Sequence, residues 1–223
     1  MFPLKDSIPS KRFPFVNYLI IITTVIVYLY EKSLGREIYK FYLEYGVIPL
    51  KIFMPHNIVS ISEKITPFFT SIFIHGGFFH LLSNMYFLFV FGDNVEDYYG
   101  HFRYLLFYLG CGIFAAFIQV IMFPKSNIPM IGASGAVAGV MGSYLILFPH
   151  SKIKTLIFII IFITIVDIPA VVFLVFWFII QFINGTSQSL IGLSGGIAWW
   201  AHIAGFVLGL IYGVYKKYNL EEE

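Results

Sequence analysis

Six runs of apolar residues, separated by polar segments, limit what this 223-residue chain can fold into. Charged residues make up only 12% of it, about half their usual share in a soluble domain. A helix needs about 20 apolar residues to cross the hydrocarbon of a bilayer. We therefore predict an all-α integral membrane protein embedded in the lipid bilayer. The six expected spans are residues 13–30, 68–91, 102–123, 131–148, 170–183 and 197–215.

Other global features narrow the classes of function. A net charge of +2 gives no reason to expect a nucleic-acid partner, and the single cysteine, Cys111, excludes an intramolecular disulfide. The first apolar run ends in VYLYEKSLG rather than in a small-residue cleavage site, so we interpret it as a membrane span and not as a cleavable signal peptide. We expect one domain over residues 1–223.

Two connecting segments are harder to assign. Residues 31–66 are too polar to span a membrane and too apolar for a free linker, which predicts a long interfacial loop. Residues 153–166, IKTLIFIIIFITIV, are apolar but short and strongly β-branched. A seventh span there would put the polar clusters described below on opposite faces. We therefore expect a partly re-entrant or interfacial connection that leads into the fifth span.

Basic residues predict the orientation of the chain. Lysine and arginine in short loops gather on the cytoplasmic side of a membrane. If both termini are cytoplasmic, the short outer loops hold only Lys125. The inner side then holds Lys5, Lys11, Arg12, Arg103, Lys152, Lys154, Lys216 and Lys217.

With this orientation, three polar clusters fall at a similar depth, toward the outer face. His75, His80 and Asn84 lie in the first half of the second span, Ser134 lies at the start of the fourth, and His202 lies about a third of the way into the sixth. Ionisable side chains are costly inside a membrane, so they usually face the bundle interior or a water-filled cavity. The clusters are therefore candidates for one shared site.

Glycines in the fourth and sixth spans indicate how two of these clusters meet. Small residues at helical spacing let two helix backbones approach closely. If the two glycine faces pack together, Ser134 and His202 come within reach of each other. The residues are Gly135, Gly139 and Gly142 in the fourth span, and Gly205, Gly209 and Gly213 in the sixth.

A serine beside a histidine indicates serine hydrolysis. A hydroxyl is a weak nucleophile until a base removes its proton, and imidazole titrates near neutral pH. The acids fall on the inner side or in the long first outer loop, so we expect a Ser134–His202 dyad without a carboxylate. Donors to the oxyanion are expected from the backbone at the helix start that holds Ser134, and from His80 and Asn84, which share a helix face. A metal site at His75 and His80 is the weaker interpretation, because the chain has no HExxH motif.

Three segments, taken together, resemble the rhomboid family of intramembrane serine proteases. They are HGGFFHLLSN with His75, His80 and Asn84, GASG with Ser134, and AHIAGFVLG with His202. The segments FGDNVEDYYG and PAVVFLVFWFIIQ also resemble bacterial members, and the likeness covers nearly all of residues 11–217.

The resemblance implies a six-helix rhomboid bundle with Ser134 as nucleophile and His202 as base. It also implies an oxyanion hole made by His80, Asn84 and the Ser134 backbone, with His75 in support and Gly132 in the lining. The family cleaves other membrane-spanning proteins near their outer ends, often after a small residue and without a cofactor. A bacterial cytoplasmic membrane, with the active site toward the outside, is the expected setting.

The sequence departs from the family in three places, one of which is the connection at residues 153–166, longer and more apolar than in compact members. Some members carry an aromatic residue four positions after the serine, packed against the histidine. That position is Ala138 here, so His202 must be held in another way. Some members also carry a Trp-Arg pair in the first outer loop, whereas residues 31–66 contain no tryptophan.

Other interpretations stay open at this stage. A single membrane serine is usually a packing residue, and a single histidine is usually a satisfied polar one. The rival functions are a catalytically inactive rhomboid-like binder or chaperone, and a small transporter. An inactive relative would usually have lost Ser134 or His202, and a transporter would be expected to show paired charges or broken helices in related halves.

Overall fold

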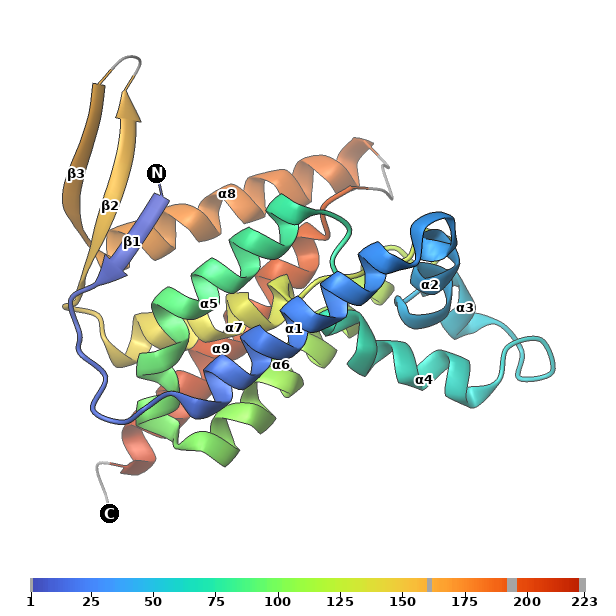
Figure 1. Cartoon of the computed structure of the whole chain (residues 1–223), viewed down its shortest axis with the longest axis horizontal. Coiled ribbons are helices and arrows are strands. Elements are labelled where there is room, and N and C mark those ends of the chain that lie inside the picture. Colours follow the sequence, from blue (N-terminus) through green and yellow to red (C-terminus); the bar gives the residue numbers. More distant parts are fainter. Residues whose placement is uncertain (1, 160–161, 192–195, 221–223) are drawn as a thin grey trace.

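The computed structural model describes residues 2–159, 162–191 and 196–220, which form a bundle of helices with a small sheet at one end (Figure 1). The elements in chain order are β1 (Phe2–Asp6), α1 (Phe15–Ser33), η1 (Gly35–Glu37), α2 (Ile38–Tyr45), α3 (Pro49–Phe53), α4 (Ile61–Thr70), η2 (Ser71–Phe73), α5 (Phe78–Tyr99), α6 (His101–Met122), α7 (Ser134–Leu147), β2 (Lys152–Ile159), β3 (Phe162–Pro169), α8 (Ala170–Ile191) and α9 (Trp199–Leu220).

The helices have the apolar character of an integral membrane protein. Within the described residues, α1, α6 and α8 are each long and apolar enough to cross a membrane. A fourth crossing results if α4–η2 and α5, which are bent by 76° relative to each other, form one broken span. With 14 residues, α7 is shorter than the about 20 residues that a straight crossing needs. That the chain crosses the membrane six times stays a prediction.

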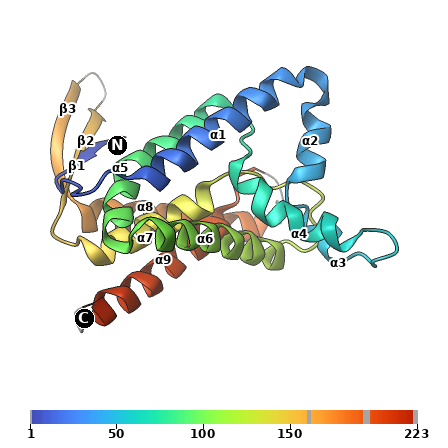
Figure 2. The same cartoon turned by 60° about the horizontal axis from the view of Figure 1, so that its bottom comes forward.

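Helix α7 lies at the centre of the bundle, against α5, α6, α8 and α9 (Figures 1 and 2). All of residues 135–144 are buried. A Cβ atom on Gly205 of α9 would lie 2.0 Å from the carbonyl oxygen of Gly135, and one on Gly209 would lie 1.9 Å from that of Gly139. No side chain fits at those distances, so the backbones of α7 and α9 are in direct contact.

The bounds of two helices differ most from the expected spans. The second span was expected over residues 68–91, but α5 begins at Phe78 because η2 and the Gly76–Gly77 pair interrupt the helix. This break leaves His75 outside the regular helix, although it was expected within the second span. The fifth span was expected to end at residue 183, but α8 continues to Ile191.

Polar side chains in the extension of α8 bond to carbonyls of their own helix. Asn184 donates to the Ile180 carbonyl at 2.8 Å, and Thr186 donates to the Phe182 carbonyl at 2.9 Å. Such bonds satisfy polar side chains without an external partner, and this explains how the helix continues through a stretch that looks like a loop.

The chain is mostly helical, but the prediction of an all-α protein is wrong for two segments, which form strands. Residues 153–159 and 162–166, expected to form a partly re-entrant or interfacial connection, belong to the antiparallel pair of β2 and β3, in which Lys152 lies opposite Pro169. Strand β1 adds to the free edge of β2 and completes a sheet in the order β1-β2-β3. β-branched residues favour strands, and pairing satisfies the backbone of an apolar segment too short to cross. The hairpin leads directly into α8.

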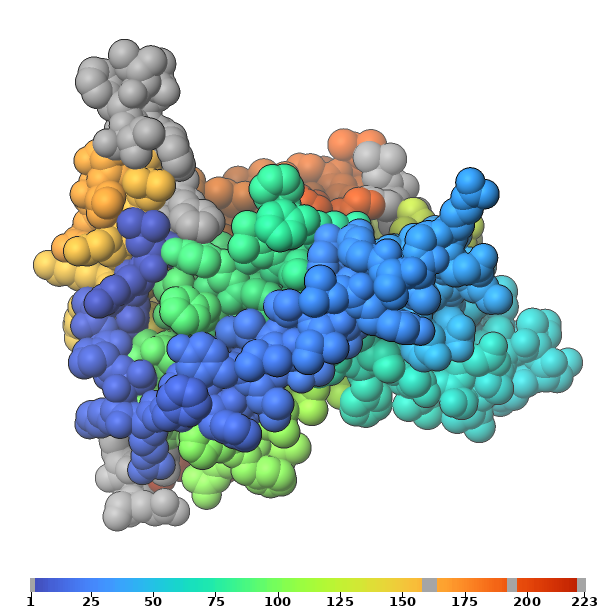
Figure 3. All heavy atoms as spheres, viewed as in Figure 1, coloured from blue at the N-terminus to red at the C-terminus, as the bar shows by residue number. Residues whose placement is uncertain are grey.

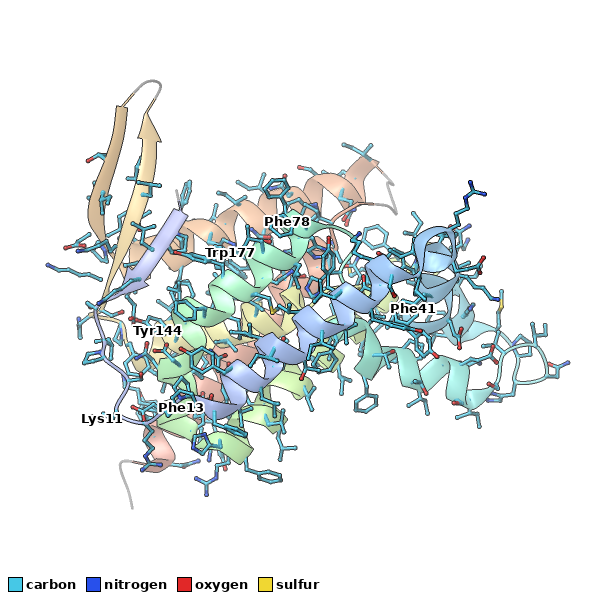
Figure 4. The ribbon with its side chains drawn as sticks, in the orientation of Figure 1. Lys11, Phe13, Phe41, Phe78, Tyr144 and Trp177 are labelled. Atoms are coloured by element: carbon cyan, nitrogen blue, oxygen red, sulfur yellow. The ribbon has the colours of Figure 1, made fainter. Side chains whose placement is uncertain are left out.

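Helix α1 lies across one face of the bundle (Figure 3), and its first turn is hydrogen-bonded to α5. The carboxylate of Glu96 accepts hydrogen bonds from the N–H groups of Val16 at 2.9 Å and Asn17 at 2.7 Å. These amides lie in the first turn of α1, where no carbonyl of the helix itself can accept from them. At the sheet end of the bundle, Tyr144 donates to Asp6 at 2.6 Å and so joins α7 to β1 (Figure 4).

The direct contact between α7 and α9 predicts which glycines tolerate a methyl group. Gly205→Ala should destabilise the protein by about 1–3 kcal/mol, because its Cβ would overlap the Gly135 carbonyl. Gly110→Ala on α6 is the matched control, since a Cβ there meets nothing within 4 Å and alanine favours the helix. Thermal unfolding in detergent measures both variants. Equal melting temperatures for the two would contradict the packing described here.

Candidate active site

Ser134 is the first residue of α7, and the chain before it is held in an unusual conformation. Gly132 has a φ of +130°, which L-residues rarely adopt, and its N–H donates to the Ser71 carbonyl at 2.9 Å. The N–H groups of the first turn of a helix have no acceptor within the helix. The turn at Gly132 thus presents the Ser134 hydroxyl and the start of α7 to the adjoining cavity.

The structure brings Ser134 and His202 together from two helices. The distance from Ser134 Oγ to His202 Nε2 is 2.7 Å, which is a hydrogen bond. His202 lies in the first turn of α9, one turn before Gly205. The contact of Gly205 with Gly135 brings the two backbones close enough for the short serine side chain to reach the imidazole.

His202 is also contacted on its other nitrogen and on its ring. Its Nδ1 lies 2.7 Å from Oε1 of Gln181 on α8. The ring of Trp177, one turn earlier on α8, stacks on the imidazole with the centroids 6.0 Å apart and the planes at 28°. Trp199 packs edge-on at 5.9 Å. These contacts hold the imidazole in place of the aromatic residue that some family members carry at the position of Ala138.

Sequence reasoning did not assign Gln181 or Trp177 to the site. The available signal was their spacing of four residues, which places an amide and an indole on one face of an otherwise apolar helix. The neighbour of that face depends on how α8 is rotated and packed in the bundle, which cannot be predicted from the sequence.

His75 and His80 form a second cluster beside the turn at Gly132. Their rings lie edge to face with centroids 4.9 Å apart. His75 is fully buried, and its Nε2 accepts a hydrogen bond from the Ala133 N–H at 3.4 Å. His80 lies directly against Gly132, since a Cβ there would be 2.7 Å from the His80 Cε1 atom. The two histidines therefore support the chain just before Ser134.

Asn84 lies one turn after His80 on the same helix face. Its Nδ2 donates to the His80 carbonyl at 2.9 Å, which uses one of the two N–H bonds of the amide. Asn84 lines a cavity of about 570 Å³ together with His80, Ser134 and His202. Polar residues from the three predicted segments thus share one cavity, whereas His75 lies behind its lining.

The same cavity has an apolar side that could hold part of a ligand. Its lining includes Phe87, Val137, Met141 and Trp177. An apolar wall with a few convergent polar groups is typical of a binding site. Among the described residues, no group of three or more histidine, cysteine, aspartate or glutamate side chains is placed to hold a metal ion.

Glu31 is a buried carboxylate that the sequence placed in the first outer loop. It lies in the last turn of α1, is fully buried, and accepts a hydrogen bond from the His75 N–H at 3.1 Å. Tyr42 of α2 donates to it at 3.3 Å, and burial together with the charge of Glu31 raises the pKa of Tyr42 to about 12. The phenol therefore stays protonated as a donor. Through this carboxylate, α1 and α2 fix the segment that carries His75.

Comparisons with known proteins match the region that contains this site. A profile of the rhomboid domain matches residues 62–219. Rhomboid protein 1, mitochondrial, of Saccharomyces cerevisiae is 29% identical over 161 residues, which cover 69% of this chain and 42% of the relative. Rhomboid-like protein 11, chloroplastic, of Arabidopsis thaliana is 42% identical over 72 residues, 32% of this chain and 25% of the relative.

A bacterial protein is among the similar proteins. Rhomboid protease GluP of Bacillus subtilis is 40% identical over 76 residues, which cover 34% of this chain and 14% of the relative. The chain spans less than half the length of each of these three relatives. The likeness thus covers only part of each relative, and the resemblance found in the sequence is confirmed at the level of the family.

Proposed function

Because this chain belongs to the rhomboid family, we propose that it is an intramembrane serine endopeptidase that hydrolyses peptide bonds of membrane-spanning proteins. The observation that supports this most is the 2.7 Å hydrogen bond between Ser134 Oγ and His202 Nε2, inside a cavity with an apolar wall. The name of the similar Bacillus subtilis protein, a rhomboid protease, agrees with the proposal.

In the proposed reaction, Ser134 and His202 act as nucleophile and base. His202 Nε2 takes the hydroxyl proton as Ser134 Oγ attacks the carbonyl carbon of the substrate peptide. The imidazolium then gives this proton to the leaving amine, and an acyl-enzyme remains. Water attacks the ester with the same base and releases the second product. Side chains and water suffice for these steps, so the proposal includes no cofactor.

The oxyanion of the tetrahedral intermediate requires donors already in place before the reaction. We assign this function to the Ser134 N–H and to the side chains of His80 and Asn84. Asn84 has a second N–H bond besides the one that the His80 carbonyl accepts, and it lines the cavity. Gly132 and His75 position the chain before Ser134 through their contacts with His80 and Ala133.

We extend the proposal to the whole chain, residues 1–223, as one rhomboid membrane domain of six spans in a bacterial cytoplasmic membrane. Both termini lie in the cytoplasm and the active site faces the outside. In support, β1 and the last turns of α9 lie at the same end of the bundle, away from α2–α4 (Figure 1). The positive-inside pattern of lysine and arginine agrees with this orientation.

Removal of either reacting group should abolish hydrolysis. Ser134→Ala and His202→Ala are each expected to reduce cleavage of a model transmembrane substrate in liposomes to background, with unfolding temperatures near that of the wild type. Ser143→Ala is the matched control on α7, since the Ser143 hydroxyl bonds to Tyr99 away from the cavity. The dyad assignment is wrong if either variant turns over substrate at a near-normal rate. If the wild-type protein is folded and binds the substrate but does not hydrolyse it, the alternative of an inactive binder is favoured.

Asn84→Ala should lower kcat by roughly tenfold and leave KM almost unchanged. The loss is smaller than the about 10²–10³-fold effect of a single oxyanion donor in soluble enzymes, because two other donors remain. Asn94→Ala is the control: this buried asparagine of the same helix bonds to the Ile8 carbonyl, away from the cavity. It should lower the melting temperature and spare kcat. An Asn84→Ala variant that only loses stability would make Asn84 structural.

The orientation is tested by single cysteines at two exposed positions, Arg36 and His150. Cys111 is 1% exposed and gives little background. In intact cells an impermeant thiol reagent should label Arg36→Cys and spare His150→Cys, because the first lies after α1 on the outer side. The reverse labelling would overturn the proposed topology.

A further inference from the structure

The hydrogen bond between His202 and Gln181 supplies the dyad with a partner that is not an acid. In a Ser-His-Asp triad, the carboxylate holds the imidazole in the tautomer that leaves Nε2 free to accept a proton. Here the atom 2.7 Å from His202 Nδ1 is the amide oxygen of Gln181. Gln181 is 5% exposed, and both residues of this pair line the cavity.

The orientation of the Gln181 amide is fixed by its second hydrogen bond. Its Nε2 donates to the carbonyl of Trp177, one turn earlier on α8, at 3.2 Å. A carbonyl oxygen only accepts, so the amide nitrogen must face it. The amide oxygen is therefore the atom that faces His202, and the two ends of the amide cannot be exchanged without loss of a bond.

The fixed amide in turn decides which nitrogen of His202 carries the proton. The amide oxygen has no hydrogen, so the bond forms only when His202 Nδ1 carries one. In the neutral imidazole, Nε2 then has the free lone pair, and this is the atom 2.7 Å from Ser134 Oγ. The ring of Trp177, stacked on the imidazole, limits its rotation out of this arrangement.

A neutral acceptor is suited to this position inside a membrane protein. A buried carboxylate would carry a desolvation penalty whenever His202 is neutral. The amide avoids that penalty, selects the same tautomer and still offers a dipole to the imidazolium that forms during the reaction. Its oxygen is a weaker acceptor than a carboxylate, so it stabilises the imidazolium less.

We propose that Gln181 is the positioning residue of the dyad, which selects the Nδ1–H tautomer of His202 and so leaves Nε2 as the base for Ser134. The kinetic part of this inference rests on the proposed serine endopeptidase function, and the tautomer part does not. Since Gln181 belongs to α8, the dyad is complete only when α8 is docked against α9.

The direct test is the ¹⁵N NMR spectrum of the full-length protein in detergent, labelled at histidine nitrogens. At about pH 8 an ordinary imidazole is neutral, and the spectrum separates Nδ1–H from Nε2–H rings. Wild-type His202, assigned with His202→Asn, should be in the Nδ1–H form. Gln181→Leu, of similar size but without an acceptor, should show both tautomers. Gln181→Glu restores an acceptor and should restore the Nδ1–H form.

Kinetics of the same variants complete the test. Gln181→Leu should lower kcat about 10- to 100-fold with KM within about twofold, and Gln181→Glu should recover part of the loss. Asn184→Leu is the matched control on α8, because the Asn184 amide bonds to the Ile180 carbonyl of its own helix. If Gln181→Leu does not fold, Gln181→Ala is measured in the same way.

The outcomes separate this inference from the proposed function. A Gln181→Leu variant with wild-type kcat and a single Nδ1–H tautomer would overturn the positioning function while hydrolysis stands. A wild-type chain that shows the expected tautomers without hydrolysis would support the positioning function and contradict the protease. A kcat loss in Gln181→Leu without a change of tautomer would also overturn the inference, because the loss would then have another cause.

Discussion

The direct contact between the backbones of α7 and α9 determines most of the remaining structure. Carbonyl oxygens of Gly135 and Gly139 occupy the space that a Cβ on Gly205 or Gly209 would need, so the two helices approach as closely as their main chains permit. In a membrane, where lipid tails are as apolar as leucine, such packing stabilises helix association through many short van der Waals contacts. The same approach brings His202 to the start of α7. A serine side chain, only one bond longer than alanine, needs a histidine that close.

A second constraint is the number of buried polar atoms around Ser134, at the start of α7. Buried polar groups require partners, and the structure provides them in a connected series. Glu31 accepts from the His75 backbone, His75 accepts from the Ala133 N–H, and His80 packs on Gly132. On the other side, Trp177 and Gln181 hold His202. Elements that are far apart in the chain thus fix one cavity. A substitution in α1 or α8 is expected to change the position of Ser134 or His202, although Ser134 belongs to neither helix.

The sequence allowed part of this arrangement to be predicted. Apolar runs located the helices, and the glycine spacing anticipated the approach of Ser134 and His202. The sheet of β1, β2 and β3 was missed. Strand β1 pairs with a strand about 150 residues away, which local composition does not reveal, and the β-branched residues of β2 and β3 were interpreted as an interfacial connection and not as strands. The functions of Gln181 and Glu31 were missed for a similar reason: each depends on how a helix is rotated in the bundle. An acid in the last turn of α1 looks like a loop residue until the structure shows it fully buried.

The central claim is that Ser134, activated by His202, is a nucleophile. A fluorophosphonate probe reacts covalently with such a serine, and the modified residue can be identified by tandem mass spectrometry of the detergent-solubilised protein. The account predicts a single adduct, on Ser134, that disappears in His202→Ala while the variant remains folded. Absence of an adduct from the folded wild-type protein, or an equal adduct on Ser134 in His202→Ala, would contradict it.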